Sequence, residues 1–259
     1  MRHIKKLSDD TRRETCDMKL LITAGPTREP LDPVRFLSNR SSGKMGYALA
    51  EAAAARGHTV ILVSGPVALT LFVDAASPLR QAATPGQAGR ISEKRPEVAS
   101  TKRIQLVRVV TAADMLAAVK LHLKKCDALI MAAAVADWRP VRVAKRKMKK
   151  GDEQRLTLEF KRTPDILKTI APLKGKKIFI GFAAETHNVH AEAKRKLREK
   201  RLDMIVANDV TAPGVGFEVE TNRVTIFDAH SAEQLPLMSK HDVAERILER
   251  LEARRSGGA

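Results

Sequence analysis

The sequence has few aromatic residues and few cysteines. Aromatic residues make up 3 % of its 259 residues, with one Trp and one Tyr, so its core must consist mostly of Ala, Val, Leu and Ile. Its two cysteines, Cys16 and Cys126, cannot form a disulfide framework, and no CxxC or Cys/His cluster indicates zinc. This cysteine content fits a reducing compartment and predicts a cytoplasmic protein.

The sequence also lacks long apolar runs. No stretch approaches the length of a membrane span, and the first residues have no apolar run of the kind found in signal peptides. We therefore expect no association with a membrane. Because residues 1–17 are polar throughout, we expect them to form a disordered tail.

Acidic residues are outnumbered by basic ones, 30 to 47, which gives a formal net charge of +17. Such a surface attracts polyanions, among them nucleic acids and phosphorylated small molecules. One hypothesis is therefore a non-enzymatic nucleic-acid-binding protein, with the basic run KRKMKK at residues 145–150 as a binding patch. The scarcity of aromatic residues for base stacking, and the lack of a known binding module, argue against it.

Short apolar runs alternate with helical patterns along the chain. This alternation predicts an α/β fold with a doubly wound, mainly parallel sheet flanked by helices in a Rossmann-like three-layer arrangement, with a small added β region. We expect strands at 19–23, 59–63, 104–110, 127–133, 155–160, 177–182, 203–207 and 223–227. We expect helices at 47–56, 111–125, 188–200 and 239–254, and one that begins at residues 163–165 with Pro in its first turn. Thr111 is the expected N-cap of the second helix, and Asp114 stands at the third helical position, close to a capping box.

The chain is expected to form a single domain over residues 18–255. Residues 77–102 are aperiodic and rich in Pro, Gly and basic residues, so they are predicted to form a mobile surface insertion.

The segment SNRSSGKMG, residues 38–46, combines short polar side chains with Gly43 and Gly46 and precedes an Ala-rich helix. Glycine allows backbone N–H groups to approach a ligand closely, and the positive end of a helix dipole attracts anions. The pattern predicts an anion site, although an ordinary Ser-capped helix start would also explain it.

Two common nucleotide motifs are missing. There is no GxGxxG after the first strand, and the second strand ends in Ser64-Gly65-Pro66, with no acidic residue for a ribose hydroxyl. These features argue against a nicotinamide dehydrogenase. No Walker A motif is present either.

Polar and charged residues gather in the loops that follow the expected strands, where ligands bind in such sheets. Lys196 and Lys200 lie four residues apart and so share one helix face. This face could bind a phosphate or could simply be a solvated surface. Asp137 could accept from a ribose or a base, or simply cap a turn. Asp165 fits a first-turn residue that compensates the helix dipole, and Asn39 fits either a turn or a donor to a carboxylate or oxyanion.

Several long motifs resemble those of phosphopantothenate–cysteine ligase (phosphopantothenoylcysteine synthetase), the bacterial CTP-dependent type. They occur in order from about Lys19 to Arg250: LITAGPTREPLDPVRFLSNRSSGKMG, AAAVADWRP, KMKK, TPDIL, GFAAET and ANDV. Members of this family are often fused to a flavin-dependent decarboxylase. Because the sequence starts shortly before these motifs, we expect a free-standing synthetase. It departs from the family in the longer insertion at 77–102 and in Arg40, where many relatives have His.

The resemblance implies that 4′-phosphopantothenate and L-cysteine are joined through an acyl-cytidylate formed from CTP, with Mg²⁺ on the triphosphate. Some relatives use ATP, but SNRSSGKMG and KMKK favour CTP. Arg35 and Asn39 resemble residues that hold the acyl intermediate, and Lys147 resembles a catalytic, nucleotide-binding lysine. The implied nucleotide contacts also include Ala133, Asp137, Thr163, Pro164, Asp165, Ile166, Phe182, Lys196 and Lys200. The family is dimeric, so we expect a homodimer, with a separate phosphopantothenoylcysteine decarboxylase as a further candidate partner.

Overall fold

A computed structural model describes residues 17–69, 71, 103–149, 154–185, 189–209 and 219–257. The tail expected at 1–17 lies outside these ranges except for Asp17, and the insertion expected at 77–102 lies outside them entirely.

The centre of the structure is an eight-stranded sheet in the order β13-β12-β10-β9-β6-β1-β4-β5. Six of its strands are parallel: β1 (Lys19–Ala24), β4 (Thr59–Ser64), β5 (Ile104–Arg108), β6 (Ala128–Met131), β9 (Ile178–Glu185) and β10 (Met204–Asp209). β12 (Val224–Phe227) and β13 (Ala232–Gln234) extend it as antiparallel strands. The parallel strands have the doubly wound Rossmann order, which confirms the predicted fold class.

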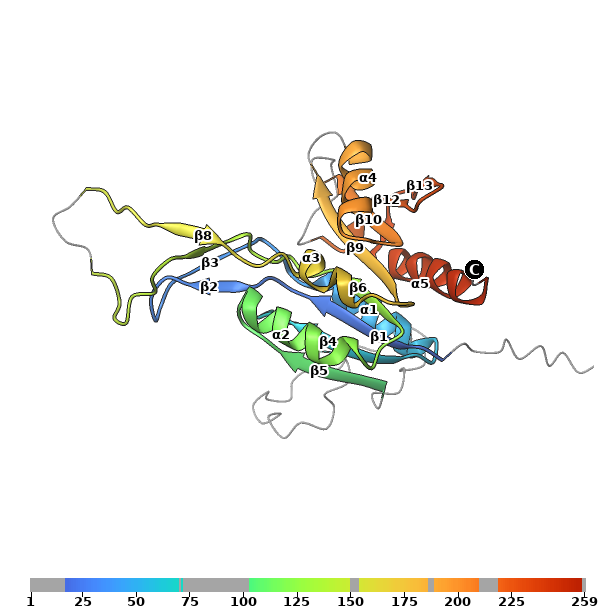
Figure 1. The fold of residues 1–259 in the computed structure, drawn as a ribbon, viewed down its shortest axis with the longest axis horizontal. Coiled ribbons are helices and arrows are strands. Elements are labelled where there is room, and N and C mark those ends of the chain that lie inside the picture. The colour runs from blue at the N-terminus through green and yellow to red at the C-terminus, as the bar shows by residue number, and fades with distance from the viewer. Residues whose placement is uncertain are drawn as a thin grey trace, which may run out of the picture.

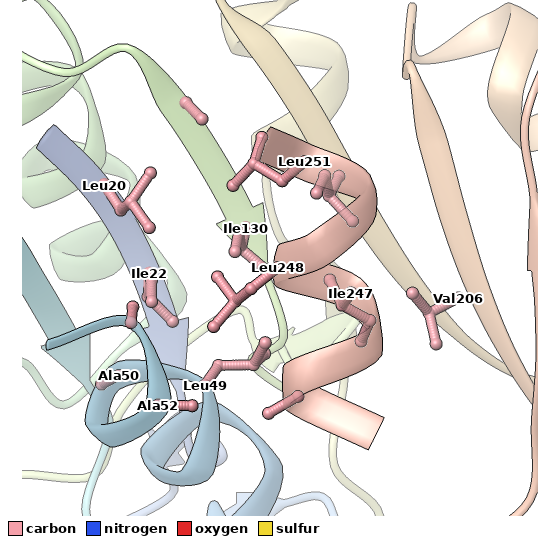
Figure 2. Close-up of a cluster of buried hydrophobic side chains, with 14 of the residues drawn as sticks. Leu20, Ile22, Leu49, Ala50, Ala52, Ile130, Val206, Ile247, Leu248 and Leu251 are labelled. Atoms are coloured by element: carbon pink, nitrogen blue, oxygen red, sulfur yellow. The ribbon is translucent and has the colours of Figure 1, made fainter. Parts of the chain in front are cut away.

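Helices cover both faces of this sheet because side chains alternate along its strands. Leu20 and Ile22 of β1 pack with α1 (Lys44–Ala55) and α5 (Lys240–Ser256), as Figure 2 shows. Leu21, between them, faces the opposite way and packs with the remaining helices. These are α2 (Ala112–Leu123), α3 (Ile166–Ile170) and α4 (Val189–Glu199), and a 3₁₀ turn, Ala171–Leu173, follows α3. The result is the expected three-layer core.

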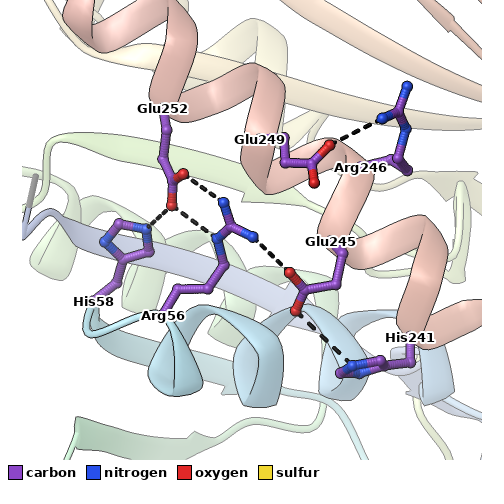
Figure 3. Close-up of polar contacts among 7 residues, drawn as sticks. All are labelled: Arg56, His58, His241, Glu245, Arg246, Glu249 and Glu252. Atoms are coloured by element: carbon purple, nitrogen blue, oxygen red, sulfur yellow. Dashed lines mark hydrogen bonds and ion pairs between the residues drawn. The ribbon is translucent and has the colours of Figure 1, made fainter. Parts of the chain in front are cut away.

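Ion pairs join α1 to α5 at the edge of this core (Figure 3). Arg56 donates to both carboxylate oxygens of Glu252, at 2.9 and 2.6 Å, and to Glu245 at 2.6 Å. His58 is buried: its Nε2 lies 2.9 Å from Glu252, and its Nδ1 accepts from the Met18 N–H. Because the peptide donor requires an unprotonated Nδ1, the pattern fits a neutral ring with its proton on Nε2.

Two hairpins project beyond the sheet, on the left of Figure 1. β2 (Arg28–Pro30) pairs with β3 (Phe36–Ser38), and β7 (Trp138–Pro140) pairs with β8 (Phe160–Arg162). We call residues 28–38, 138–149 and 154–162 the arm. A third small pair, β11 (Thr221–Asn222) with β14 (Met238–Ser239), lies before α5. The added β region is therefore present, and it is larger than the sequence indicated.

Several predicted boundaries are wrong. The strand predicted at 155–160 begins only at Phe160 and runs to Arg162, because residues 160–162 pair with β7, whereas residues 155–159 have no regular structure. The third strand ends at Arg108, before Val110. Pro164 precedes the first turn of α3, because the Asp165 side chain caps that helix by accepting from the Lys168 N–H. In contrast, the expected N-cap Thr111 and its capping box with Asp114 are confirmed at α2.

The Ala-rich helix begins at Lys44, three residues before the predicted start. Its N-cap is Gly43, at a φ of 81° that favours glycine, and no side chain caps the helix. A Ser-capped start is therefore wrong. Gly46 is required by close packing, because a Cβ there would lie 2.5 Å from the Ala24 Cβ. The two glycines thus let the start of α1 lie directly over the end of β1.

Candidate functional site

The order of the parallel strands reverses between β1 and β6, with β4 and β5 on one side and β9 and β10 on the other. The chains leaving β1 and β6 meet at this point: the Ala134 N–H donates to the Gly25 carbonyl at 2.9 Å. The Ala133 N–H similarly donates to the Thr23 hydroxyl at 3.2 Å. Crevices at such reversals are where doubly wound sheets bind ligands.

A cavity of about 470 Å³ opens at the carboxyl end of β6, beside the middle of β9. Its volume lies within the range of small-molecule sites. Its walls come from the end of β6, the β7–β8 hairpin, the start of α3, the middle of β9 and the residue after α4. The lining residues are Met131, Ala133, Val135, Asp137, Trp138, Arg162, Thr163, Pro164, Asp165, Ile166, Leu167, Phe182 and Lys200.

Most residues that the motifs assign to nucleotide binding line this one cavity. They are Ala133, Asp137, Thr163, Pro164, Asp165, Ile166, Phe182 and Lys200. The exceptions are Lys147 and Lys196. Lys147 lies in the arm and is exposed, and Lys196 is half-buried one turn before Lys200. Four separate segments of the chain thus converge on one cavity.

Charged side chains of both signs line this cavity. Lys200 Nζ lies 3.1 Å from Asp165 Oδ2, while Asp165 Oδ1 caps α3. The Asp137 carboxylate is exposed, and within the described residues it has no hydrogen bond or ion pair. The cavity therefore offers one carboxylate and one guanidinium, that of Arg162, beside an ion pair that a ligand can compete for.

Threonines hold the strand-end segment that borders the cavity. The Ala136 N–H donates to the Thr27 hydroxyl at 2.9 Å, and the Thr163 hydroxyl donates to the Ala136 carbonyl at 2.5 Å. The Thr163 N–H also donates to the Asp137 carbonyl at 2.9 Å. The N–H and carbonyl groups of this segment are therefore held by hydrogen bonds before any ligand binds.

Asn39 lies beside the same segment, and its orientation is determined by its partners. Its Nδ2 donates to the carbonyls of Ala134, at 3.3 Å, and Val135, at 3.0 Å. An inverted amide would place its oxygen against two carbonyl oxygens, so Nδ2 must face them. Both amide protons are thereby engaged. In this conformation the Asn39 Oδ1 remains as an acceptor, and the role of Asn39 toward a substrate stays a prediction.

Arg35 is engaged within the arm. Its Nη1 donates to Asp32 Oδ2 and to the Met148 carbonyl, each at 3.0 Å. Met148 directly follows Lys147. Arg35 and Lys147, two of the three expected catalytic residues, are therefore linked through the Met148 backbone.

The loop expected to bind an anion lies at the same sheet edge. Ser41 and Ser42 hydroxyls accept weakly, at 3.4 and 3.5 Å, from the N–H groups of Gly43 and Lys44. Lys44 also forms an ion pair with Glu220. Anion binding at this loop stays a prediction.

Trp138 and Arg162 line the cavity but were not predicted as site residues. They face each other across the β7–β8 pair, with the guanidinium carbon 5.7 Å from the indole centroid. Trp138 is within the motif AAAVADWRP, and Arg162 directly precedes TPDIL, so proximity to these motifs was the available signal. Asn208, in ANDV, is the last residue but one of β10, and its buried Oδ1 has no hydrogen-bond partner among the described residues.

Within the part of the chain that the structure describes, no three His, Cys, Asp or Glu side chains gather as a metal-binding group. None of the described helices has the length and apolar character needed to cross a membrane.

Comparison with known proteins gives consistent results. The coenzyme A biosynthesis bifunctional protein CoaBC of Bacillus subtilis is 45 % identical over 251 residues, which cover 96 % of this chain. The Escherichia coli K12 protein of the same name is 41 % identical over 242 residues, or 92 % of this chain. A crystal structure of the C-terminal domain of a CoaBC protein has a TM-score of 0.69 and 41 % identity, and covers 93 % of this chain and 97 % of that one.

This chain spans about half the length of the curated relatives it matches, 54 % of the Bacillus subtilis protein and 52 % of the Escherichia coli protein. The family model described as DNA/pantothenate metabolism flavoprotein C-terminal domain matches residues 15–84 and 89–254. Because these ranges include most of the sequence, the chain belongs to the family of DNA/pantothenate metabolism flavoprotein C-terminal domains.

Proposed function

We propose that this chain is a phosphopantothenate–cysteine ligase of coenzyme A biosynthesis that acts in the cytoplasm. In the first step a 4′-phosphopantothenate carboxylate attacks the α-phosphate of CTP, and pyrophosphate leaves. In the second, the cysteine amine attacks the acyl carbon of the acyl-cytidylate, loses a proton, and displaces CMP. The products are 4′-phosphopantothenoylcysteine, CMP and pyrophosphate.

The observation that carries this proposal is the convergence of the family's motifs on one cavity. AAAVADWRP, TPDIL, GFAAET and the end of α4 are far apart in sequence, yet each supplies lining residues. The similarity to coenzyme A biosynthesis proteins agrees with it and does not favour a nucleic-acid-binding protein.

The residues around the cavity suit the two steps. Lys200 and Arg162 supply cations for a phosphorylated nucleotide, and Lys196 extends this basic surface along α4. Arg35 and Lys147 would stabilise the charge that develops on the α-phosphate. Asn39 would hold the acyl-cytidylate indirectly, by fixing the Ala134 and Val135 carbonyls and presenting its Oδ1 toward the incoming amine.

Magnesium would enter with the triphosphate. Mg²⁺ prefers hard oxygen ligands. It is usually bound by one or two carboxylates and by substrate phosphates, and it retains several water ligands. The Asp137 carboxylate fits that need, because no described residue occupies it, whereas Asp165 is already paired with Lys200. Bound Mg²⁺ would neutralise triphosphate charge during displacement of pyrophosphate.

The direct test measures pyrophosphate release with CTP, 4′-phosphopantothenate and cysteine present together, and then with each omitted in turn. The proposal expects release that requires CTP and 4′-phosphopantothenate, and product CMP that requires cysteine in addition. Absence of release with all three present would refute the ligase assignment.

Nucleotide choice is a separate part of the proposal. The Thr163–Ile166 turn at the cavity wall matches the bacterial CTP-dependent pattern, so we expect CTP to support turnover much better than ATP, GTP or UTP. Equal rates with ATP and CTP at subsaturating concentrations would overturn this choice and leave the ligase assignment intact.

We further propose that the protein forms a homodimer through the arm. Apolar side chains are exposed there, including Val34 at 60 %, Val143 at 51 % and Leu156 at 67 %. A second copy of the same arm would remove these groups from water. Sedimentation velocity should show a dimer that the double variant Val143→Asp/Leu156→Asp dissociates, while Leu121→Asp on α2, exposed at 68 %, should not. A monomeric wild-type protein would contradict the proposal.

A separate decarboxylase is a further candidate partner, testable by co-sedimentation.

A further inference from the structure

Asp32 is a buried carboxylate in the turn between β2 and β3 that sequence reasoning did not single out. Its side chain has no exposed surface, although the Arg35 side chain beside it is 45 % exposed. A charged group is buried in this way only when its oxygens are fully hydrogen-bonded.

The two oxygens of Asp32 have different partners. Oδ1 accepts from the N–H groups of Val34, at 2.7 Å, and Arg35, at 2.8 Å, which closes the turn. Oδ2 accepts from the Arg35 guanidinium at 3.0 Å and from the Met148 N–H at 3.1 Å. One oxygen therefore holds the local turn, and the other holds a residue 116 positions away.

Arg35 completes the contact with that residue. While Asp32 accepts from the Met148 N–H, Arg35 donates to the Met148 carbonyl at 3.0 Å. We call this arrangement the clasp: Asp32 and Arg35 binding both backbone groups of Met148. A further backbone bond, from the Ala144 N–H to the Leu31 carbonyl at 3.0 Å, joins the same two segments.

The clasp explains how Asp32 remains charged. Burial acts to raise the pKa of this carboxylate, but hydrogen bonds from the N–H groups of Val34, Met148 and Arg35, together with the Arg35 charge, lower the pKa below its usual value. All four donors require the ionised form.

We propose that Asp32 is a positioning residue for Lys147. Lys147 is exposed, so packing does not fix its place, whereas the neighbouring Met148 backbone is held on both sides by the clasp. The clasp sets where the Lys147 ammonium lies relative to Arg35. This inference rests in part on the proposed function, which gives Lys147 its task.

Asp32→Asn separates the two roles of the carboxylate. The Asn Oδ1 can still accept from the Val34 and Arg35 N–H groups and keep the turn. Its NH₂ group then faces two donors, the Arg35 guanidinium and the Met148 N–H, so the clasp opens. Asp228→Asn is the matched control, because Asp228 Oδ1 closes a similar turn by accepting from His230 and Ser231, far from the arm.

The first measurement needs no activity. Trypsin should cut within residues 145–149 roughly tenfold faster in Asp32→Asn, because two charge-assisted hydrogen bonds that hold this segment are lost. Cleavage in Asp228→Asn should match the wild type. Unchanged cleavage in Asp32→Asn would overturn the clasp, and this result is independent of whether the protein is a ligase.

The second measurement asks whether Asp32 acts through Lys147. In pyrophosphate release, kcat should fall roughly tenfold in Asp32→Asn with little change in KM for CTP, the pattern of a contact that matters in the transition state. In a Lys147→Gln background the same change should have no further effect on the residual rate. Additive losses, or a normal kcat in Asp32→Asn, would contradict the positioning role.

Met148→Pro provides a second variant that leaves Asp32 intact. It removes the Met148 N–H together with the Met side chain, fixes φ at this position and restricts the backbone of Lys147, while Asp32 and Arg35 stay intact. It should therefore reproduce the lower kcat, and the faster cleavage at bonds other than the Lys147–Pro bond, even if Asp32→Asn does not fold. Wild-type behaviour of Met148→Pro in both measurements would overturn the proposal.

Discussion

The α1–α5 face and the arm differ in how deeply their side chains are buried. Between α1 and α5, leucines and alanines are fully buried, and ion pairs of Arg56 close the edge. The arm has short hairpins with strands of three residues, exposed apolar side chains and a run of basic residues, and its described buried carboxylates are Glu29 and Asp32. We infer that folding energy is concentrated in the first region, whereas ligand chemistry depends on the second.

The strongest test of this division is Lys147→Gln in the arm. Loss of a cation that faces developing phosphate charge should cost about 3–4 kcal/mol of transition-state stabilisation, which slows pyrophosphate release by a factor of about 160 to 900. Because Lys147 is exposed, the thermal midpoint should not change. Lys145→Gln in the same exposed loop is the control and should stay active. Normal turnover in Lys147→Gln would break the comparison.

The converse change is Leu248→Ala on α5. Leu248 is fully buried between α1 and the sheet, as Figure 2 shows, so the variant should lose about 3 kcal/mol in the free energy of unfolding. Denaturant titration measures this loss. Below the unfolding transition kcat should be close to that of the wild type, and a large fall in kcat for the folded variant would show that the two regions are coupled.

Asn39→Asp tests the junction between the regions. A carboxylate cannot donate to the Ala134 and Val135 carbonyls, so the segment that we propose to hold the intermediate should shift. We expect acyl-cytidylate to form and accumulate, because the cysteine step is impaired by about 2 kcal/mol, the effect of losing these hydrogen bonds. Rapid-quench assays with labelled CTP, with and without cysteine, separate the two steps. A variant that forms no intermediate would show that Asn39 acts in the first step.

The smallest expected effect concerns the ion pairs in Figure 3. Hydrogen bonding from Arg56 lowers the pKa of Glu252 below its usual 4.5, so this pair stabilises the folded state above that pH and the contribution is lost as the pH falls through the lowered pKa. Glu252→Gln should therefore cost about 1–2 kcal/mol at pH 7, and the difference from wild type should shrink below pH 4.5.

Glu249→Gln is the control for this pH dependence. Glu249 pairs only with Arg246 among the described contacts, and both side chains are nearly half exposed, so its loss should cost less than about 0.5 kcal/mol. The test compares the free energy of unfolding of the wild type with that of Glu252→Gln at pH 7 and at pH 3. If the difference between the two proteins is the same at both pH values, the ionised carboxylate is not what stabilises this edge.

The sequence was informative where one local signal determined the structure. Apolar runs predicted the central strands, and the Thr111–Asp114 spacing predicted the α2 cap. The arm was less accessible, because β7 pairs with β8 across a long charged segment, and the strand predicted there at 155–160 is paired only from Phe160 onward. The cavity positions came from motifs, but Asp32 and Arg162 depend on contacts between distant segments, which composition and spacing do not reveal.

The position of Trp138 has a practical consequence. It is the one tryptophan in the sequence, it is 47 % exposed, and it lies at the wall of the cavity beside Arg162. Tryptophan emission from the native protein therefore reports on the polarity and quenching environment of this one spot. A nucleotide that enters the cavity should alter that emission directly, so equilibrium and stopped-flow titrations need no attached dye, and the signal arises where the chemistry is proposed to occur.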